Sequence, residues 1–190
     1  VLTAGDDAKK PFTTAAGWAI TLDKIAVSTG PLYYFSGAPL FAWAPPSLLD
    51  RFLGIRVAHA HPGHYQEGTA LGELLQPSSA DLEAGDAVLA DGAGITGTFR
   101  SARFTWSSPP VGPAAAALGG HVVVLEGKGT KGAASKAFRA SADLADTYDI
   151  DDKAQVEGCV FTEADVEGDG TVTLRLKASL WLDQVELDEL

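Results

Sequence analysis

Methionine is absent from this 190-residue chain, and cysteine occurs once, as Cys159. A single cysteine excludes an intrachain disulfide, and its apolar neighbours Val160 and Phe161 predict a buried, unreactive thiol. The missing methionine removes the thioether ligands that favour copper(I). Because Val1 cannot be a translational start, we expect a processed N-terminus, such as signal-peptide removal leaves, and an extracytoplasmic location.

Positive charge is also scarce. The chain has 14 Lys and Arg against 25 Asp and Glu, which gives a formal net charge of −11. An acidic protein of this kind repels phosphate backbones, so nucleic acid is excluded as an expected partner. A cation, a protein partner or a homo-oligomer remains open. No apolar run is long enough to span a bilayer, so we predict no transmembrane segment.

The usual catalytic motifs are missing as well. The sequence contains no Gly-x-Ser-x-Gly elbow, no Gly-rich phosphate loop leading into a helix and no His-Glu-x-x-His pair. We therefore expect a protein that is not an enzyme, unless a metal site keeps an open coordination position.

What is present is a series of short segments with alternating apolar and polar residues, separated by turns rich in Gly and Pro. In residues 18–27, for example, Trp18, Ile20 and Leu22 alternate with polar neighbours, as in a half-buried strand. The other predicted strands are residues 32–35, 98–106, 120–126, 137–144, 155–162 and 171–177. This pattern predicts an all-β fold, an antiparallel immunoglobulin-like β-sandwich with long loops and at most short helices.

The length predicts a single β-sandwich domain over residues 1–190. Within it we expect an N-terminal extension at 1–11 and a long excursion at 36–80. Segments 111–118 and 127–132 read as loops, 81–89 reads as a strand broken at Gly85, and 155–162 is expected to pair with 171–177. Residues 179–190 predict either a final strand or a docked short helix.

The excursion carries the most informative stretch, because three of the four histidines, His59, His61 and His64, lie within six residues. Imidazole is the commonest metal ligand among side chains. Two residues two positions apart share a face in extended backbone, and Pro62-Gly63 is a turn signal that brings the third histidine back. The motif predicts a three-imidazole site for zinc or copper(II).

Other interpretations of the histidines stay open. A solvated, unliganded turn has the same composition, and a proton-linked or purely structural role is a further alternative. His121 opens an apolar strand, where a histidine is ordinarily satisfied by local hydrogen bonds. If the fold brings His121 to the loop, it becomes a fourth ligand.

A second, weaker metal candidate is the acidic turn that holds Asp165, Glu167 and Asp169. These residues occupy the first, third and fifth positions of a calcium-loop pattern, followed by Gly170. Position twelve is Leu176, where a bidentate Glu is required, so an ordinary hairpin turn is the alternative interpretation.

Residues 17–24, 59–65 and 97–106 together resemble uncharacterised bacterial secreted or lipoprotein-type β-sandwich proteins. The resemblance implies an extracytoplasmic (periplasmic, cell-surface or secreted) setting and an immunoglobulin-like architecture, and it brings no activity or site residues with it. Lipoproteins carry a lipidated N-terminal cysteine, and Val1 does not match that feature.

The sequence therefore predicts an extracytoplasmic protein that binds zinc or copper(II) through His59, His61 and His64, for capture, delivery or structural clamping. The alternative is a non-catalytic structural or interaction module of a larger surface or extracellular assembly. An aromatic group around Tyr33, Phe35 and Trp43 is read either as a binding platform or as core packing.

Overall fold

The structure is a computed structural model that describes residues 2–4, 10–39, 66–149, 151–183, 185 and 187–189. The described strands are β1 (Leu2–Ala4), β2 (Phe12–Thr13), β3 (Ala19–Thr29), β4 (Leu32–Phe35), β5 (Ala70–Leu74), β6 (Ser78–Asp81), β7 (Ala93–Gly94), β8 (Gly97–Thr105), β9 (Val123–Lys131), β10 (Ala134–Ala142), β11 (Gln155–Val166) and β12 (Leu174–Leu176). The described helical elements are all short: α2 (Ala115–Leu118), η1 (Leu144–Thr147), α3 (Ala178–Leu182) and η2 (Leu187–Glu189).

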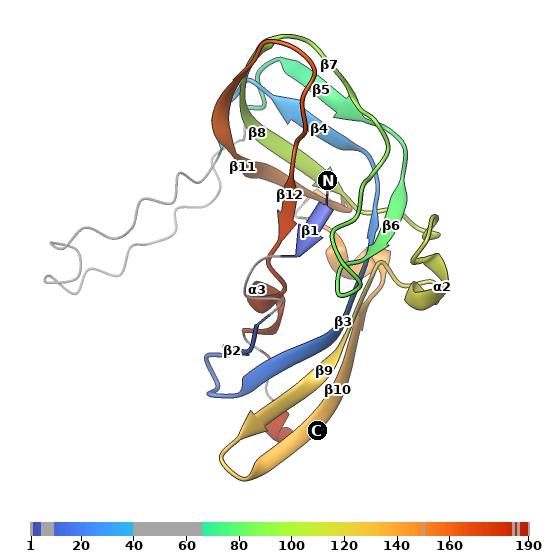
Figure 1. The fold of residues 1–190 in the computed structure, drawn as a ribbon, viewed down its shortest axis with the longest axis vertical. Coiled ribbons are helices and arrows are strands. Elements are labelled where there is room, and N and C mark those ends of the chain that lie inside the picture. Colours follow the sequence, from blue (N-terminus) through green and yellow to red (C-terminus); the bar gives the residue numbers. More distant parts are fainter. Residues whose placement is uncertain are drawn as a thin grey trace, which may run out of the picture.

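The strands form two five-stranded sheets and one small pair. One sheet has the order β10-β9-β3-β2, with β6 also pairing with β3, and the other has the order β11-β8-β4-β5-β7. All pairings within these two sheets are antiparallel. Figure 1 shows the first sheet mostly in the lower half of an elongated molecule and the second in the upper half. The predicted all-β class is confirmed.

The chain passes from the lower sheet to the upper one at Gly30, between β3 and β4. The Gly30 N–H donates to the Thr105 carbonyl at 2.8 Å. A side chain cannot be added at this position, because a Cβ would lie 2.5 Å from Thr105 Oγ1 and 2.9 Å from the Trp106 carbonyl oxygen. Glycine is therefore required for the close approach between the two sheets.

The core follows from the predicted alternation. Ile20 and Leu22 of β3 are buried together with Trp18, which directly precedes the strand, as expected for one face of extended backbone. A second apolar cluster contains Leu32, Leu74 and Phe104 of the upper sheet. Leu89, Trp106 and Leu174 pack against both clusters, so the two sheets share one continuous core.

Several sequence-based expectations are corrected. Segments 155–162 and 171–177 do not pair with each other: β11 pairs with β8, and β12 pairs in parallel with β1. Residues 127–131, expected in a loop, continue β9, and the turn is at Gly132. The segment 111–118 contains α2. The predicted strand at 81–89 is absent apart from Asp81, which ends β6, and the bridge between Leu2 and Ala87.

The predicted N-terminal extension and the predicted long excursion both contribute strands. In the predicted N-terminal extension, Leu2 is fully buried and belongs to β1. In the predicted 36–80 excursion, β5 pairs with β4 and β6 pairs with β3. The remaining insertion between β4 and β5, residues 36–69, carries the histidine motif.

The C-terminal residues dock as short helical turns, which is one of the two predicted forms. Ala178, Leu182 and Leu187 are buried in the core of the lower sheet. We refer to η2, Leu187–Glu189, as the C-terminal strap. No helix in the described part of the chain is long and apolar enough to cross a membrane.

The strap gives a pH-dependent prediction through Asp188. The Asp188 carboxylate accepts hydrogen bonds from Lys131 Nζ at 2.8 Å and from Trp18 Nε1 at 3.3 Å. The Lys131 hydrogen bond is the main cause that holds the pKa of Asp188 below its ordinary value of 3.8. The ionised Asp188 carboxylate therefore stabilises docking of the strap fully above pH 3.8. This stabilisation is lost as the pH falls through the lowered pKa.

We expect the Trp18 indole N–H resonance to shift in this acid range, and we expect the Lys131→Gln variant to move the transition toward pH 3.8. A transition that is unchanged in Lys131→Gln would contradict the assignment to Asp188.

Candidate functional site at the base of the long insertion

Strand register gives β4 and β8 two chemically different faces. Tyr34 lies opposite Ala102 on the core-facing side. Tyr33 lies opposite Arg103 on the other side, because neighbouring residues of a strand point to opposite faces. The Arg103 side chain is therefore directed toward the face on which the insertion between β4 and β5 begins and ends.

Arg103 is held by aromatic rings and carboxylates at once. Its guanidinium lies 4.8 Å from the Tyr33 ring centroid and 5.4 Å from that of Phe35, within cation–π range. Its Nη1 donates to Glu67 Oε1 at 2.6 Å and lies 3.9 Å from Glu157 Oε1. A guanidinium fits this position because its plane stacks on rings while its edge binds carboxylates.

Backbone hydrogen bonds close the insertion at the same place. The Gly37 N–H donates to the Glu67 carbonyl at 2.8 Å, and the Ser36 N–H donates to the Thr69 carbonyl at 3.0 Å. Ser101 Oγ donates to the Gly37 carbonyl at 2.6 Å, which ties this closure to β8. We call Ser36, Gly37, Glu67, Thr69 and Arg103 the base of the insertion.

The network continues along β11. Gln155 Nε2 donates to Glu157 Oε1 at 2.7 Å and to Asp149 Oδ2 at 2.9 Å. Burial acts to raise the pKa of Asp149, but hydrogen bonds from the Lys153 backbone and from Gln155 outweigh it and hold the pKa low. Asp149 therefore stays a carboxylate that positions Gln155 beside the base.

The base and the strands beside it carry an excess of negative charge. Glu73, Tyr33 and Arg103 lie in one cross-strand row, and Glu67 and Glu157 both contact the Arg103 guanidinium. Three carboxylates thus lie on this face around one cation. Such a surface attracts cations and disfavours anions.

Only one of the four predicted histidine ligands lies in the described part of the chain. His59, His61 and His64 lie outside the described residues. His121 is described, and its Nδ1 lies 2.6 Å from Asp143 Oδ1. In the part of the chain that the structure describes, no three His, Cys, Asp or Glu side chains form a group able to hold a metal ion. His121 is thus satisfied locally by Asp143, and its joining the loop histidines stays a prediction.

The acidic turn is also described, and its three carboxylates do not converge. Asp165 accepts a hydrogen bond from Thr98 Oγ1, and Glu167 and Asp169 are exposed beyond the end of β11. Among the described residues, they do not form a group of three side chains able to hold a metal ion. The structure therefore adds no support to the calcium prediction.

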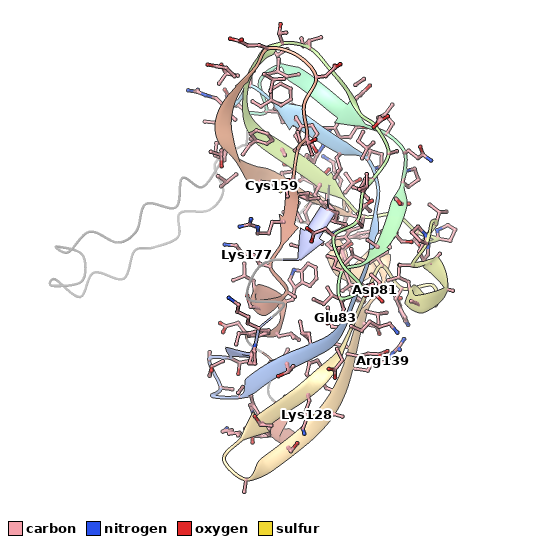
Figure 2. All side chains as sticks on the ribbon, in the orientation of Figure 1. Asp81, Glu83, Lys128, Arg139, Cys159 and Lys177 are labelled. Carbon is pink, nitrogen blue, oxygen red and sulfur yellow. The ribbon has the colours of Figure 1, made fainter. Side chains whose placement is uncertain are left out.

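Cys159 lies in the upper half of the molecule (Figure 2), and burial raises the pKa of its thiol. Its Sγ donates to the Val156 carbonyl at 3.4 Å. Burial also raises the pKa of Tyr34, and the charge of an ionised Cys159 would raise it further. Both groups stay protonated near neutral pH, as expected for a thiol that is not a nucleophile.

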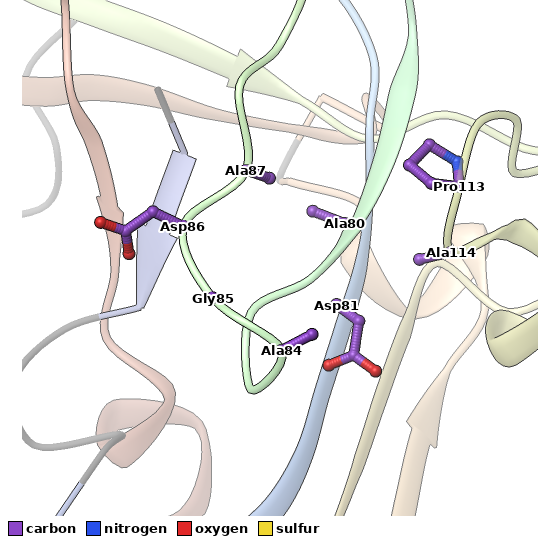
Figure 3. A pocket seen from close by; sticks show the side chains of 8 residues that line it. All are labelled: Ala80, Asp81, Ala84, Gly85, Asp86, Ala87, Pro113 and Ala114. Carbon is purple, nitrogen blue, oxygen red and sulfur yellow. The ribbon is translucent and has the colours of Figure 1, made fainter.

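A shallow hollow of about 330 Å³ lies between the end of β6 and the loop before α2 (Figure 3). Its lining consists largely of alanine methyl groups. Asp81 accepts a hydrogen bond from the Glu83 N–H at 3.2 Å, and Figure 3 shows the Asp86 carboxylate directed away from the alanines. The two carboxylates that line the hollow, Asp81 and Asp86, point in different directions (Figure 3).

The chain was compared with protein-family models, curated proteins and solved structures, and none of them matches it.

Sequence reasoning missed the base itself. Tyr33 and Phe35 were grouped with other aromatics as a platform or core. Phe35 is buried, and the structure also places both rings against Arg103. The available signal was the alternation that sets Arg103 on the polar face of its strand. Its pairing with Tyr33 could not be read without the strand register.

Arg103 gives the first mutational prediction. Arg103→Met removes the Glu67 hydrogen bond and leaves the nearby carboxylates uncompensated, so we expect the free energy of unfolding to fall by about 1–3 kcal/mol. Urea unfolding measures this change. Lys128→Met is the matched control, because Lys128 is exposed on β9, in the lower sheet (Figure 2). Equal stabilities of the two variants would contradict the role of Arg103.

Proposed function

We propose that this protein binds zinc or copper(II), without catalysis, through His59, His61 and His64. The observation that carries the proposal is that three of only four histidines lie within six residues of one insertion. Neutral imidazoles are good ligands for both ions. The metal would serve capture, delivery or structural clamping.

The base supports this proposal in two ways. Its hydrogen bonds fix where the insertion leaves and rejoins the sheet, and His64 precedes the fixed residue Glu67 by only three positions. Chain length alone therefore keeps His64 within about 11 Å of Glu67, measured between Cα atoms. The carboxylates of Glu73 and Glu157 beside the base also favour the approach of a cation. Glu67 itself is committed to Arg103 and is not proposed as a ligand.

The proposed setting is extracytoplasmic, and the proposed arrangement of the sheets is immunoglobulin-like. The setting rests on the sequence resemblance, and the arrangement of the sheets rests on the strand pattern as well. Cell fractionation with an antibody against the protein tests the setting, and recovery in the cytoplasmic fraction would contradict it.

A second function, as an interaction module with a protein partner or another copy, is favoured by large apolar side chains exposed on the described surface. Val88, Leu180 and Val160 are 83%, 70% and 66% exposed. A metal in the insertion could clamp such an interface, so the two functions are compatible. An assembly that persists after metal removal supports the module, whereas a strict monomer with and without metal contradicts it.

The metal proposal is tested by metal content and by calorimetry. Protein purified without chelator is analysed by elemental mass spectrometry, and the stripped protein is titrated with zinc and with copper(II). We expect one equivalent bound with a Kd below about 1 μM, or about −8.2 kcal/mol. Binding weaker than about 100 μM, or about −5.5 kcal/mol, would reduce the histidine motif to a surface turn.

A further inference from the structure

The C-terminal strap fills a slot in the lower sheet. Leu187 is 2% exposed and lies against Gly129 of β9. A Cβ added at Gly129 would overlap Leu187 Cδ1 and would lie 3.2 Å from Trp18 Cε3. The slot therefore exists because β9 has a glycine at this position, and it is shaped to receive a leucine.

Hydrogen bonds also hold the strap backbone at Leu187 and the side chain of Asp188. Lys136 Nζ donates to the carbonyl oxygens of Leu187 at 2.8 Å and Asp188 at 3.3 Å. Lys131 and Trp18 donate to the Asp188 carboxylate. The slot thus combines an apolar pocket, a backbone-binding ammonium and a carboxylate-binding pair, which together specify a Leu-Asp segment.

The residues that precede the strap are not covered in the same way. On α3, Leu180 is 70% exposed and Trp181 is 38% exposed. The centroid of the Trp181 ring lies 5.9 Å from that of the Trp106 ring. The strap follows Asp183 within four residues, a chain length that spans at most about 14 Å. A strap that left its own slot would therefore reach only a second molecule whose α3 lies close to its own.

We propose that the slot formed by Trp18, Gly129, Lys131 and Lys136 also receives the strap of a second copy, so that two copies exchange straps. Each exchanged contact is identical to the contact within one chain, which makes exchange a low-cost route to a dimer. Leu180 and Trp181 lie next to the crossing point, where the second copy covers them. This inference does not depend on metal binding.

A charge-exchange pair tests the proposal with full-length chains. The Lys131→Glu variant sets a carboxylate against Asp188, and the Asp188→Lys variant sets two ammonium groups against each other. Neither chain can match its own strap to its own slot. When the two chains are mixed, both strap-slot contacts between them are matched. The side chains of Lys131 and Asp188 are 43% and 53% exposed, so we expect both variants to fold, and circular dichroism checks this.

We expect each variant alone to be monomeric in sedimentation velocity, and the equimolar mixture to form a one-to-one heterodimer that native mass spectrometry identifies. The double variant Lys131→Glu/Asp188→Lys is expected to dimerise with itself, like the wild type. Adding Leu187→Ser to both chains is expected to abolish the heterodimer. A mixture that stays monomeric, or a heterodimer that survives Leu187→Ser, would overturn the proposal.

Discussion

Replacing His59, His61 and His64 together by alanine should abolish tight zinc or copper(II) binding. The three imidazoles are the proposed ligands, and without them the insertion retains only oxygen ligands, which suit these ions poorly. We expect the Kd to weaken from below about 1 μM to above about 100 μM, a loss of more than about 2.7 kcal/mol. Calorimetric titration of the stripped proteins measures the change.

His121→Ala is the matched control for this experiment. It removes the one remaining histidine, whose ring is already engaged by Asp143. We expect this variant to bind one equivalent with unchanged affinity. Loss of affinity in His121→Ala would make His121 a fourth ligand, and tight binding by the triple variant would refute the histidine site altogether.

Gly37→Ala should be the most damaging single substitution at the base. A Cβ at this position would overlap the carbonyl oxygens of Gln66 and Glu67, which are backbone atoms and cannot rotate away. The Gly37–Glu67 hydrogen bond must then open. We expect the free energy of unfolding to fall by about 1–3 kcal/mol or more, as in other overpacked sites.

Gly168→Ala is the control, because a Cβ at Gly168 meets no atom within 4 Å. Urea unfolding of both variants separates a steric effect at the base from a general effect of replacing glycine. If the base also presents the histidine motif to the metal, zinc affinity should fall in Gly37→Ala and stay unchanged in Gly168→Ala. Equal stability of the two variants would mean that the base is not tightly closed.

Strands with regular alternation could be predicted from the sequence, and those with glycine could not. Trp18, Ile20 and Leu22 mark β3 clearly because one face of the strand is buried. In β9, Gly127 and Gly129 read as a loop, yet they lie in the sheet where Thr21 and Leu187 approach too closely for any side chain. Glycine has the same appearance in a sequence whether it serves a turn or a close contact.

Contacts between segments that are distant in the sequence also could not be predicted. β1 has three residues and no pattern of its own, and its partner β12 lies at the opposite end of the chain. Arg103 could be assigned to a polar face, but its contact with Tyr33 depends on the register between β4 and β8. Periodicity assigns a face to a residue, whereas the partner across the sheet is decided by the whole fold.

The pairing of β1 with β12 has a consequence for how the chain is made. Leu2 is fully buried, with Leu174 beside it in the parallel pair, and the two residues lie far apart in the sequence. At typical synthesis rates, roughly 10 to 35 seconds pass between the emergence of these two segments from the ribosome. Throughout that time Leu2 can pair with Ala87 but not with Leu174, so the parallel pair forms only after β12 has been made.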